Sequence, residues 1–65
     1  MKFISEYMSN DESRTARVYH RGIKDFVVIV KDAMGSYYNT SFETIRVAED
    51  YAEDWVLKDE RNPNN

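Results

Sequence analysis

The hydrophobic and polar positions of this chain fall into five segments, and four of them have the two-residue period of β-strands. These four are residues 2–8, 14–20, 25–31 and 36–42. The third, DFVVIVK, is the strongest, because Val, Ile and Phe suit the pleated surface of a sheet. Short turns separate the four segments, so the pattern predicts an antiparallel meander of three to four strands.

The predicted turns contain the residues that sharp changes of direction require. A polar cluster, SNDES, follows the first strand, and DAMG follows the third. Between the second and third strands lies Gly22. We expect Gly22 to supply the positive φ that a short hairpin loop usually needs.

The fifth segment, residues 44–58, has the 3.6-residue period of an amphipathic helix. Its predicted apolar stripe consists of Ile45, Ala48, Ala52 and Trp55. Acidic side chains occupy the opposite side. Thr44 is expected to be the N-cap, its hydroxyl accepting a hydrogen bond from a backbone N–H of the first turn.

A helix of this kind cannot bury its apolar stripe alone, so it must pack on the strands that precede it. The sequence therefore predicts a single α+β domain over residues 1–60, with the order ββββα and the C-terminal helix on one face of the sheet. Residues 61–65, RNPNN, are expected to form a flexible tail. An apolar fraction of 42%, with 14% aromatic residues, is enough for a packed core in a chain of 65 residues.

Several kinds of chemistry lack the residues that they need. The chain has no cysteine and one histidine, His20, so we expect neither a disulfide nor a metal site. Gly22 and Gly35 are its only glycines, and neither belongs to a phosphate-binding motif. The acidic pairs of the helix fit a solvated face better than a catalytic or calcium site. We therefore expect no enzyme, no cofactor and no small-molecule substrate.

The chain has no segment of the length and polarity that membrane targeting requires. No apolar run approaches about 18 residues, and the N-terminal sequence MKFISEYMSN lacks an apolar core. We expect neither a membrane span nor a secretory signal, and hence a cytoplasmic protein.

The formal net charge of −3 is unevenly distributed. Residues 14–31 contain five basic residues against Asp25 alone, a balance of +4, whereas residues 43–60 contain seven acids against two bases, a balance of −5. One interpretation is that each element has its own solvated charged face. The other is a basic sheet surface complementary to an acidic helix, within one subunit or between two.

The third strand gives the best indication of function. Its alternation directs Val28 and Val30 to one face, the predicted helix side, and Val27 and Ile29 to the other. A sheet covered by one helix should be polar on the second face, and here it is not. Either a second copy covers this face, or tyrosines (Tyr7, Tyr19, Tyr37) and Lys or Arg stems shield it locally.

For so small a core we favour the second copy, which gives a two-fold homodimer through back-to-back packing of two sheets or through exchange of an edge strand. The predicted self-association face consists of Val27, Ile29 and Tyr19. The predicted function is thus a small non-enzymatic protein that binds proteins, itself included.

Nucleic-acid binding is the alternative function. Basic residues interleave with aromatic ones on adjacent predicted strands, as in modules that stack bases and neutralise phosphates. The candidate residues are Arg14, Arg17, Tyr19, Arg21, Lys24 and Lys31. An acidic pI of about 5.0 and the lack of an RNP-like motif argue against this alternative.

The last two thirds of the chain resemble a known group of proteins in pattern. The residues that carry the resemblance are Phe42, Thr44, Ala48, Glu49, Tyr51, Ala52, Glu53 and Trp55. With the hairpin-rich half before it, this block is similar to small accessory proteins of tailed bacteriophages, including phages of marine cyanobacteria. The resemblance implies a modulator of a host protein, acting in the cytoplasm of an infected bacterial cell. It implies no catalytic residue.

Overall fold

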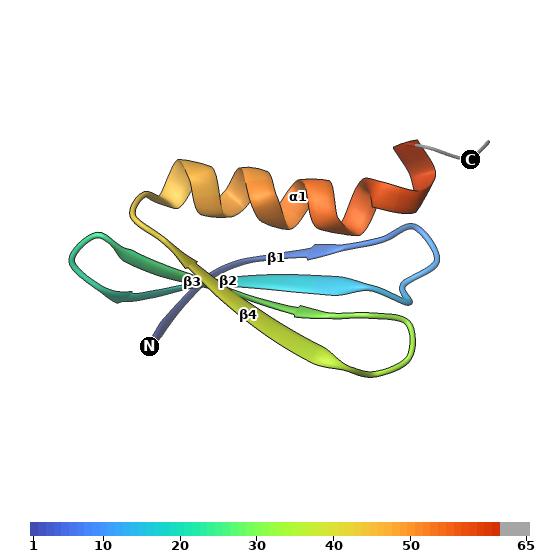
Figure 1. Ribbon diagram of the computed structural model, residues 1–65, viewed down its shortest axis with the longest axis horizontal. Helices are drawn as coiled ribbons and strands as arrows, with labels where there is room; N and C mark the ends of the chain where they lie inside the picture. Colours follow the sequence, from blue (N-terminus) through green and yellow to red (C-terminus); the bar gives the residue numbers. More distant parts are fainter. Residues whose placement is uncertain (62–65) are drawn as a thin grey trace.

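The computed structural model has four antiparallel strands and one helix that lies across one face of their sheet (Figure 1). It describes the backbone of residues 1–61 and the side chains of residues 1–57. The elements in chain order are β1 (Lys2–Met8), β2 (Thr15–Gly22), β3 (Asp25–Lys31), β4 (Tyr37–Phe42) and α1 (Ile45–Arg61). The strands lie in the order β1-β2-β3-β4, which confirms the predicted ββββα meander.

The helix ends later than the sequence pattern predicts. It continues past Lys58 to Arg61, the first residue of the predicted tail. The rest of the predicted tail, residues 62–65, lies outside the described residues.

The predicted N-cap of α1 is confirmed. The backbone N–H of Val47 donates to Thr44 Oγ1 at 3.2 Å, and that of Ala48 donates to the Thr44 carbonyl at 3.2 Å. These bonds satisfy donors that the first turn of a helix otherwise leaves open. Thr44 thereby fixes where the chain changes from strand to helix.

The two later turns differ in how they use glycine. At the β3–β4 turn, Gly35 has a φ of 90° and donates to the Asp32 carbonyl at 3.0 Å, as a left-handed turn residue should. At the β2–β3 turn the prediction is wrong: the positive φ, 52°, belongs to Lys24. The loop consists of Ile23 and Lys24 only, so Gly22 is the last residue of β2 and pairs with Asp25 beside a β-bulge.

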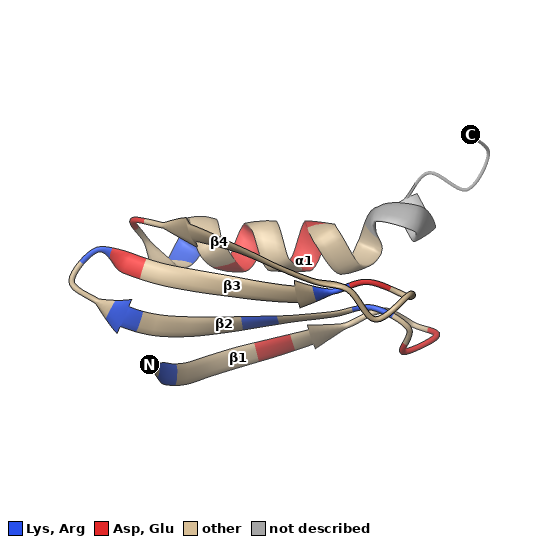
Figure 2. Ribbon diagram, turned by 60° about the horizontal axis from the view of Figure 1, so that its bottom comes forward, with Lys and Arg blue, Asp and Glu red and all other residues tan. Residues whose placement is uncertain are grey.

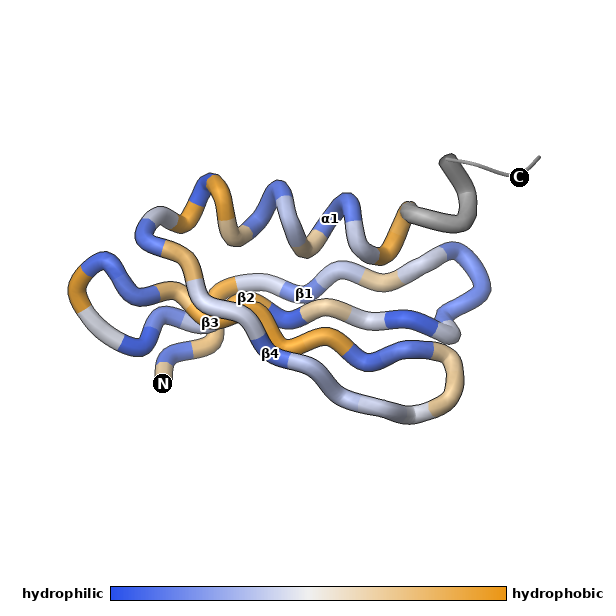
Figure 3. Tube along the Cα trace, in the orientation of Figure 1, coloured by the Kyte–Doolittle hydropathy of each residue, from blue (hydrophilic) through white to orange (hydrophobic). Residues whose placement is uncertain are grey.

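The hydrophobic core lies between α1 and the two central strands, on which the helix mainly packs. Its buried members are Ala16, Val18, Val28, Val30, Ala48, Ala52 and Val56. Figure 3 shows the strongly apolar stretch of β3 beneath the helix. The Val residues supply most of the buried volume, and the two helical alanines let the helix backbone approach the sheet closely.

The buried stripe of the helix is displaced from the predicted one. Ala48 and Ala52 are buried as expected, but the third member is Val56, while Trp55 is half-buried on the flank. Ile45 is exposed, since it is the first helical residue and has a neighbouring turn on one side only. The buried residues Ala48, Ala52 and Val56 are four positions apart, whereas the predicted stripe goes three positions from Ala52 to Trp55.

Candidate interaction surfaces

The sheet has one face under the helix and one without a second layer. Cross-strand pairs place three rows of side chains on this second face, which we call the open face. The rows are Phe3, Tyr19, Val27 and Ser41; Glu6, Arg17, Ile29 and Asn39; and Met8, Thr15, Lys31 and Tyr37. Figure 2 shows basic and acidic segments mixed over β1, β2 and β3.

The structure brings the predicted self-association residues together on the open face. Tyr19 lies directly opposite Val27, and Ile29 lies opposite Arg17. Val27 is only 5% exposed within the single chain, so its cover comes from its own neighbours. Its two direct cross-strand neighbours are Tyr19 and Ser41. Ile29 remains half-buried.

The ring of Tyr19 is itself held in place. Phe3 meets it edge to face, with ring centroids 5.8 Å apart and an interplanar angle of 72°. Such pairs add a favourable contact beyond their buried area. Phe3 remains 54% exposed, so part of the apolar surface of the open face lies on β1.

Two of the candidate nucleic-acid contacts already have acidic partners. Arg17 Nε donates to Glu6 Oε2 at 2.9 Å, and this hydrogen bond raises the pKa of Arg17. Arg21 donates to both oxygens of Asp25, at 2.7 and 3.1 Å. These bonds from Arg21 lower the pKa of Asp25. Each guanidinium would have to leave a carboxylate before it could bind a phosphate.

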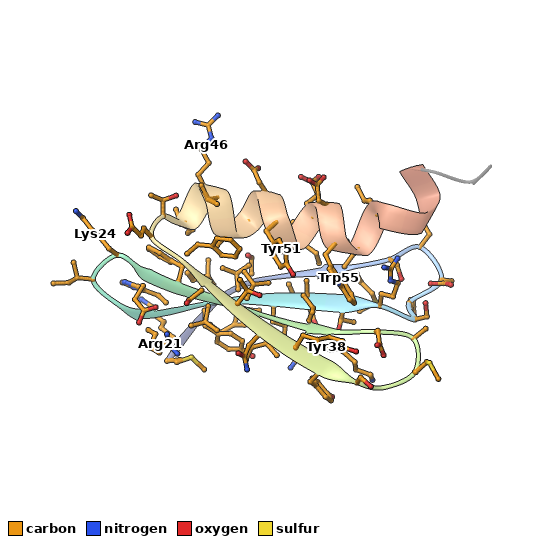
Figure 4. The ribbon with its side chains drawn as sticks, viewed as in Figure 1. Arg21, Lys24, Tyr38, Arg46, Tyr51 and Trp55 are labelled. Atoms are coloured by element: carbon orange, nitrogen blue, oxygen red, sulfur yellow. The ribbon has the colours of Figure 1, made fainter. Side chains whose placement is uncertain are left out.

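The candidate basic residues do not share one surface. Arg17, Tyr19 and Lys31 lie on the open face, whereas Arg21 and Lys24 lie at the β2–β3 hairpin (Figure 4). Arg14 lies at the opposite end of β2. Its guanidinium sits 4.7 Å from the ring centroid of Trp55, a cation–π contact on the helix side.

Strand β4 is a surface that the sequence analysis did not single out. Five of its six residues are exposed, among them Tyr37 (67%) on the open face and Tyr38 (54%) on the helix side. Within residues 1–61 it pairs with β3 alone, so one of its edges is open. Residues 33–42 are also the longest uncharged run in the chain, and Figure 2 shows β4 without a charged segment. That run is visible in the sequence, but it indicates an open edge only when β4 is known to be an outer strand.

The opposite edge of the sheet has protective features that β4 lacks. β1 carries Lys2 and Glu6, and its register shifts between Phe3 and Ser5, which marks a β-bulge. Charges and bulges are the usual means by which proteins keep an edge strand from pairing with another chain. The two edges are therefore unequal as pairing surfaces.

The aromatic side chains around β4 have fixed positions. Tyr38 donates its hydroxyl to Asp32 Oδ2 at 3.2 Å, while Asp32 Oδ1 accepts from the backbone of Met34 and Ser36. These bonds lower the pKa of Asp32, and the bond from the Ser36 backbone contributes most. At the other end of the strand, Phe42 packs on Tyr51 of α1 with ring centroids 5.2 Å apart.

The remaining candidate chemistry is modest. His20 stacks on Phe26, with ring centroids 4.7 Å apart and an interplanar angle of 11°. Among the described residues, no three His, Asp or Glu side chains gather as metal ligands would. The same part of the chain contains no helix long and apolar enough to cross a membrane.

Comparison with known proteins adds no relative. No protein-family model, curated protein or solved structure matches the chain significantly.

Proposed function

We propose that this chain is a small non-enzymatic binding protein that self-associates as a homodimer. The observation that carries the proposal is the large apolar side chains left exposed on one layer of sheet. They are Phe3, Met8, Tyr37 and Tyr38. Isolated exposed apolar residues are ordinary, but these lie in pairs on the two edge strands of the sheet, Phe3 and Met8 on β1 and Tyr37 and Tyr38 on β4. A partner that covers them would add the buried area that a domain of this size lacks.

The resemblance to phage accessory proteins extends this proposal to a second partner. A small phage protein of this kind would act in the cytoplasm of an infected bacterial cell, by binding a host protein. The acidic outer side of α1 suits a basic surface on such a partner. Self-association is the part of the proposal that can be tested with the chain alone.

The test of self-association is the molecular mass of the chain as a function of its concentration. Sedimentation analysis should show a dimer that dissociates on dilution. The melting temperature should rise with concentration, because association stabilises the folded state by mass action. A chain that sediments as a monomer at every concentration, with a constant melting temperature, would contradict the proposal.

A further inference from the structure

We propose that two copies of this chain pair antiparallel along β4, which joins their sheets into one continuous sheet with four strands from each copy. The inference rests on the proposed self-association and names its surface. The new interface consists of the open edge of β4, with Tyr38 and Phe42 packing across it on the helix side.

The charge distribution favours this strand as the contact between two identical chains. Each copy has a net charge of −3, so contact through most of its surface brings like charges together. Residues 33–42 carry no charge and include the whole of β4. The backbone N–H and C=O groups on the open edge would also exchange water for main-chain hydrogen bonds.

The unequal edges explain why pairing stops at two copies. After β4 pairs with the β4 strand of a second copy, both outer edges of the joined sheet are β1. β1 is protected by Lys2, Glu6 and its bulge. An antiparallel pair of identical strands has two-fold symmetry, so the assembly is closed.

The sequence of β4 selects a register. A two-fold axis perpendicular to the sheet keeps both helices on one side, so each residue must pair with one from the same face. With the axis at Thr40, Tyr38 lies opposite Phe42 of the second copy, and Asn39 lies opposite Ser41. This register pairs aromatic with aromatic and polar with polar, combinations that stabilise cross-strand contacts.

The open face is a weaker surface for a second copy. Val27 is already covered by its own chain, so it has little area left to bury. The middle of the face holds the Arg17–Glu6 ion pair beside Ile29, and packing two faces together would remove these charges from water. The structure thus favours the edge over the face that the sequence predicts.

A disulfide test measures the register directly. The chain has no cysteine, so a single Thr40→Cys change places two thiols opposite each other at the axis. Mild oxidation should convert this variant to a covalent dimer. Asn39→Cys is the matched control: it lies on the same strand and is also exposed, but its counterpart is displaced by two residues, beyond the reach of a disulfide. Faster cross-linking through position 39 than through position 40 would overturn the register.

Charge substitutions distinguish the edge from the open face. Thr40→Lys puts two ammonium groups opposite each other and should raise the dimer dissociation constant about tenfold or more, while the exposed site spares the fold. Ile29→Lys should leave the dimer intact. If the wild type is a monomer, both this inference and the proposed function fail. If Ile29→Lys dissociates a dimer that Thr40→Lys leaves unchanged, self-association stands and the β4 interface is wrong.

Discussion

Asp11 organises the turn between β1 and β2. Its Oδ1 accepts from the Ser13 backbone at 3.0 Å and from the hydroxyls of Ser13 and Ser9 at 2.8 Å each. Ser9 is buried. Its backbone N–H donates to the Arg14 carbonyl at 3.0 Å and its hydroxyl oxygen accepts from the Arg14 backbone N–H at 3.1 Å, which closes the turn. These hydrogen bonds lower the pKa of Asp11 to about 2, and the bond from the Ser13 backbone N–H contributes most. The ionised carboxylate is therefore the form that the folded turn prefers.

Asp11→Ala should lower the melting temperature at neutral pH. A carboxylate whose pKa falls on folding stabilises the protein above its unfolded pKa, 3.8, and this contribution disappears as the pH falls through the folded value of about 2. The difference in melting temperature between wild type and variant should consequently become smaller as the pH falls from 3.8 to about 2. Thermal melts across this range measure it, and a difference that stays constant down to pH 2 would show that the carboxylate charge has no role.

Ser13→Ala serves as the partner variant. It removes one hydroxyl donor to Asp11 but keeps the backbone donor. We expect a smaller loss with the same pH dependence, since both changes act on one carboxylate.

The helix and sheet approach each other through small side chains. Ala48 and Ala52 are fully buried against β2 and β3, and Val56 completes the contact one turn later. On one flank, Ser5 donates to Glu49 Oε2 at 3.2 Å, which fixes the rotation of α1 above β1. On the other flank, Tyr51 meets Phe42. The centre of this interface has no room for a longer side chain.

Ala52→Leu should therefore destabilise the fold by about 1–3 kcal/mol, because added volume in a packed interface forces the helix away from the sheet. Val47→Leu is the control: it lies on the exposed side of the same helix and should change stability by no more than about 0.5 kcal/mol. Denaturant unfolding at one fixed protein concentration compares the two. Equal effects would mean that side-chain volume at position 52 does not limit the approach of α1 to the sheet.

How much the sequence predicts depends on the kind of feature. Strand alternation identifies the four strands and the faces of Val27 and Val28, because the side-chain period of a strand is fixed. It does not show that Val27 is buried within its own chain, which depends on how cross-strand neighbours pack. Nor does it decide between Trp55 and Val56 at the end of the buried stripe, since the rotation of a helix is set by tertiary contacts.

The open edge of β4 is another feature that depends on the tertiary arrangement. Which strands are outermost follows from sheet order, and the predicted meander of three to four strands leaves open whether the fourth segment is its edge. Once β4 is known to be outermost, the absence of charge in residues 33–42 acquires a meaning that it lacks in the sequence alone.

The whole molecule combines a negative net charge with basic residues that are paired or dispersed. Arg17 and Arg21 bind Glu6 and Asp25, and Arg14 lies over Trp55 on the helix side. The uneven charge of the sequence thus becomes several local pairs instead of one basic surface (Figure 2). A nucleic acid requires several cations on one surface, so the fold offers it little.

We therefore expect no complex with single-stranded or duplex oligonucleotides, even at low salt. Fluorescence anisotropy of a labelled oligonucleotide over a salt series measures this. Binding that weakens with salt, and whose salt slope falls by about one unit in Arg17→Gln but not in Arg46→Gln, would restore the nucleic-acid alternative. Arg46 is the matched control because it lies on α1 and points away from the sheet (Figure 4). A change shared by both variants would instead indicate general attraction to positive charge, without a site on the open face.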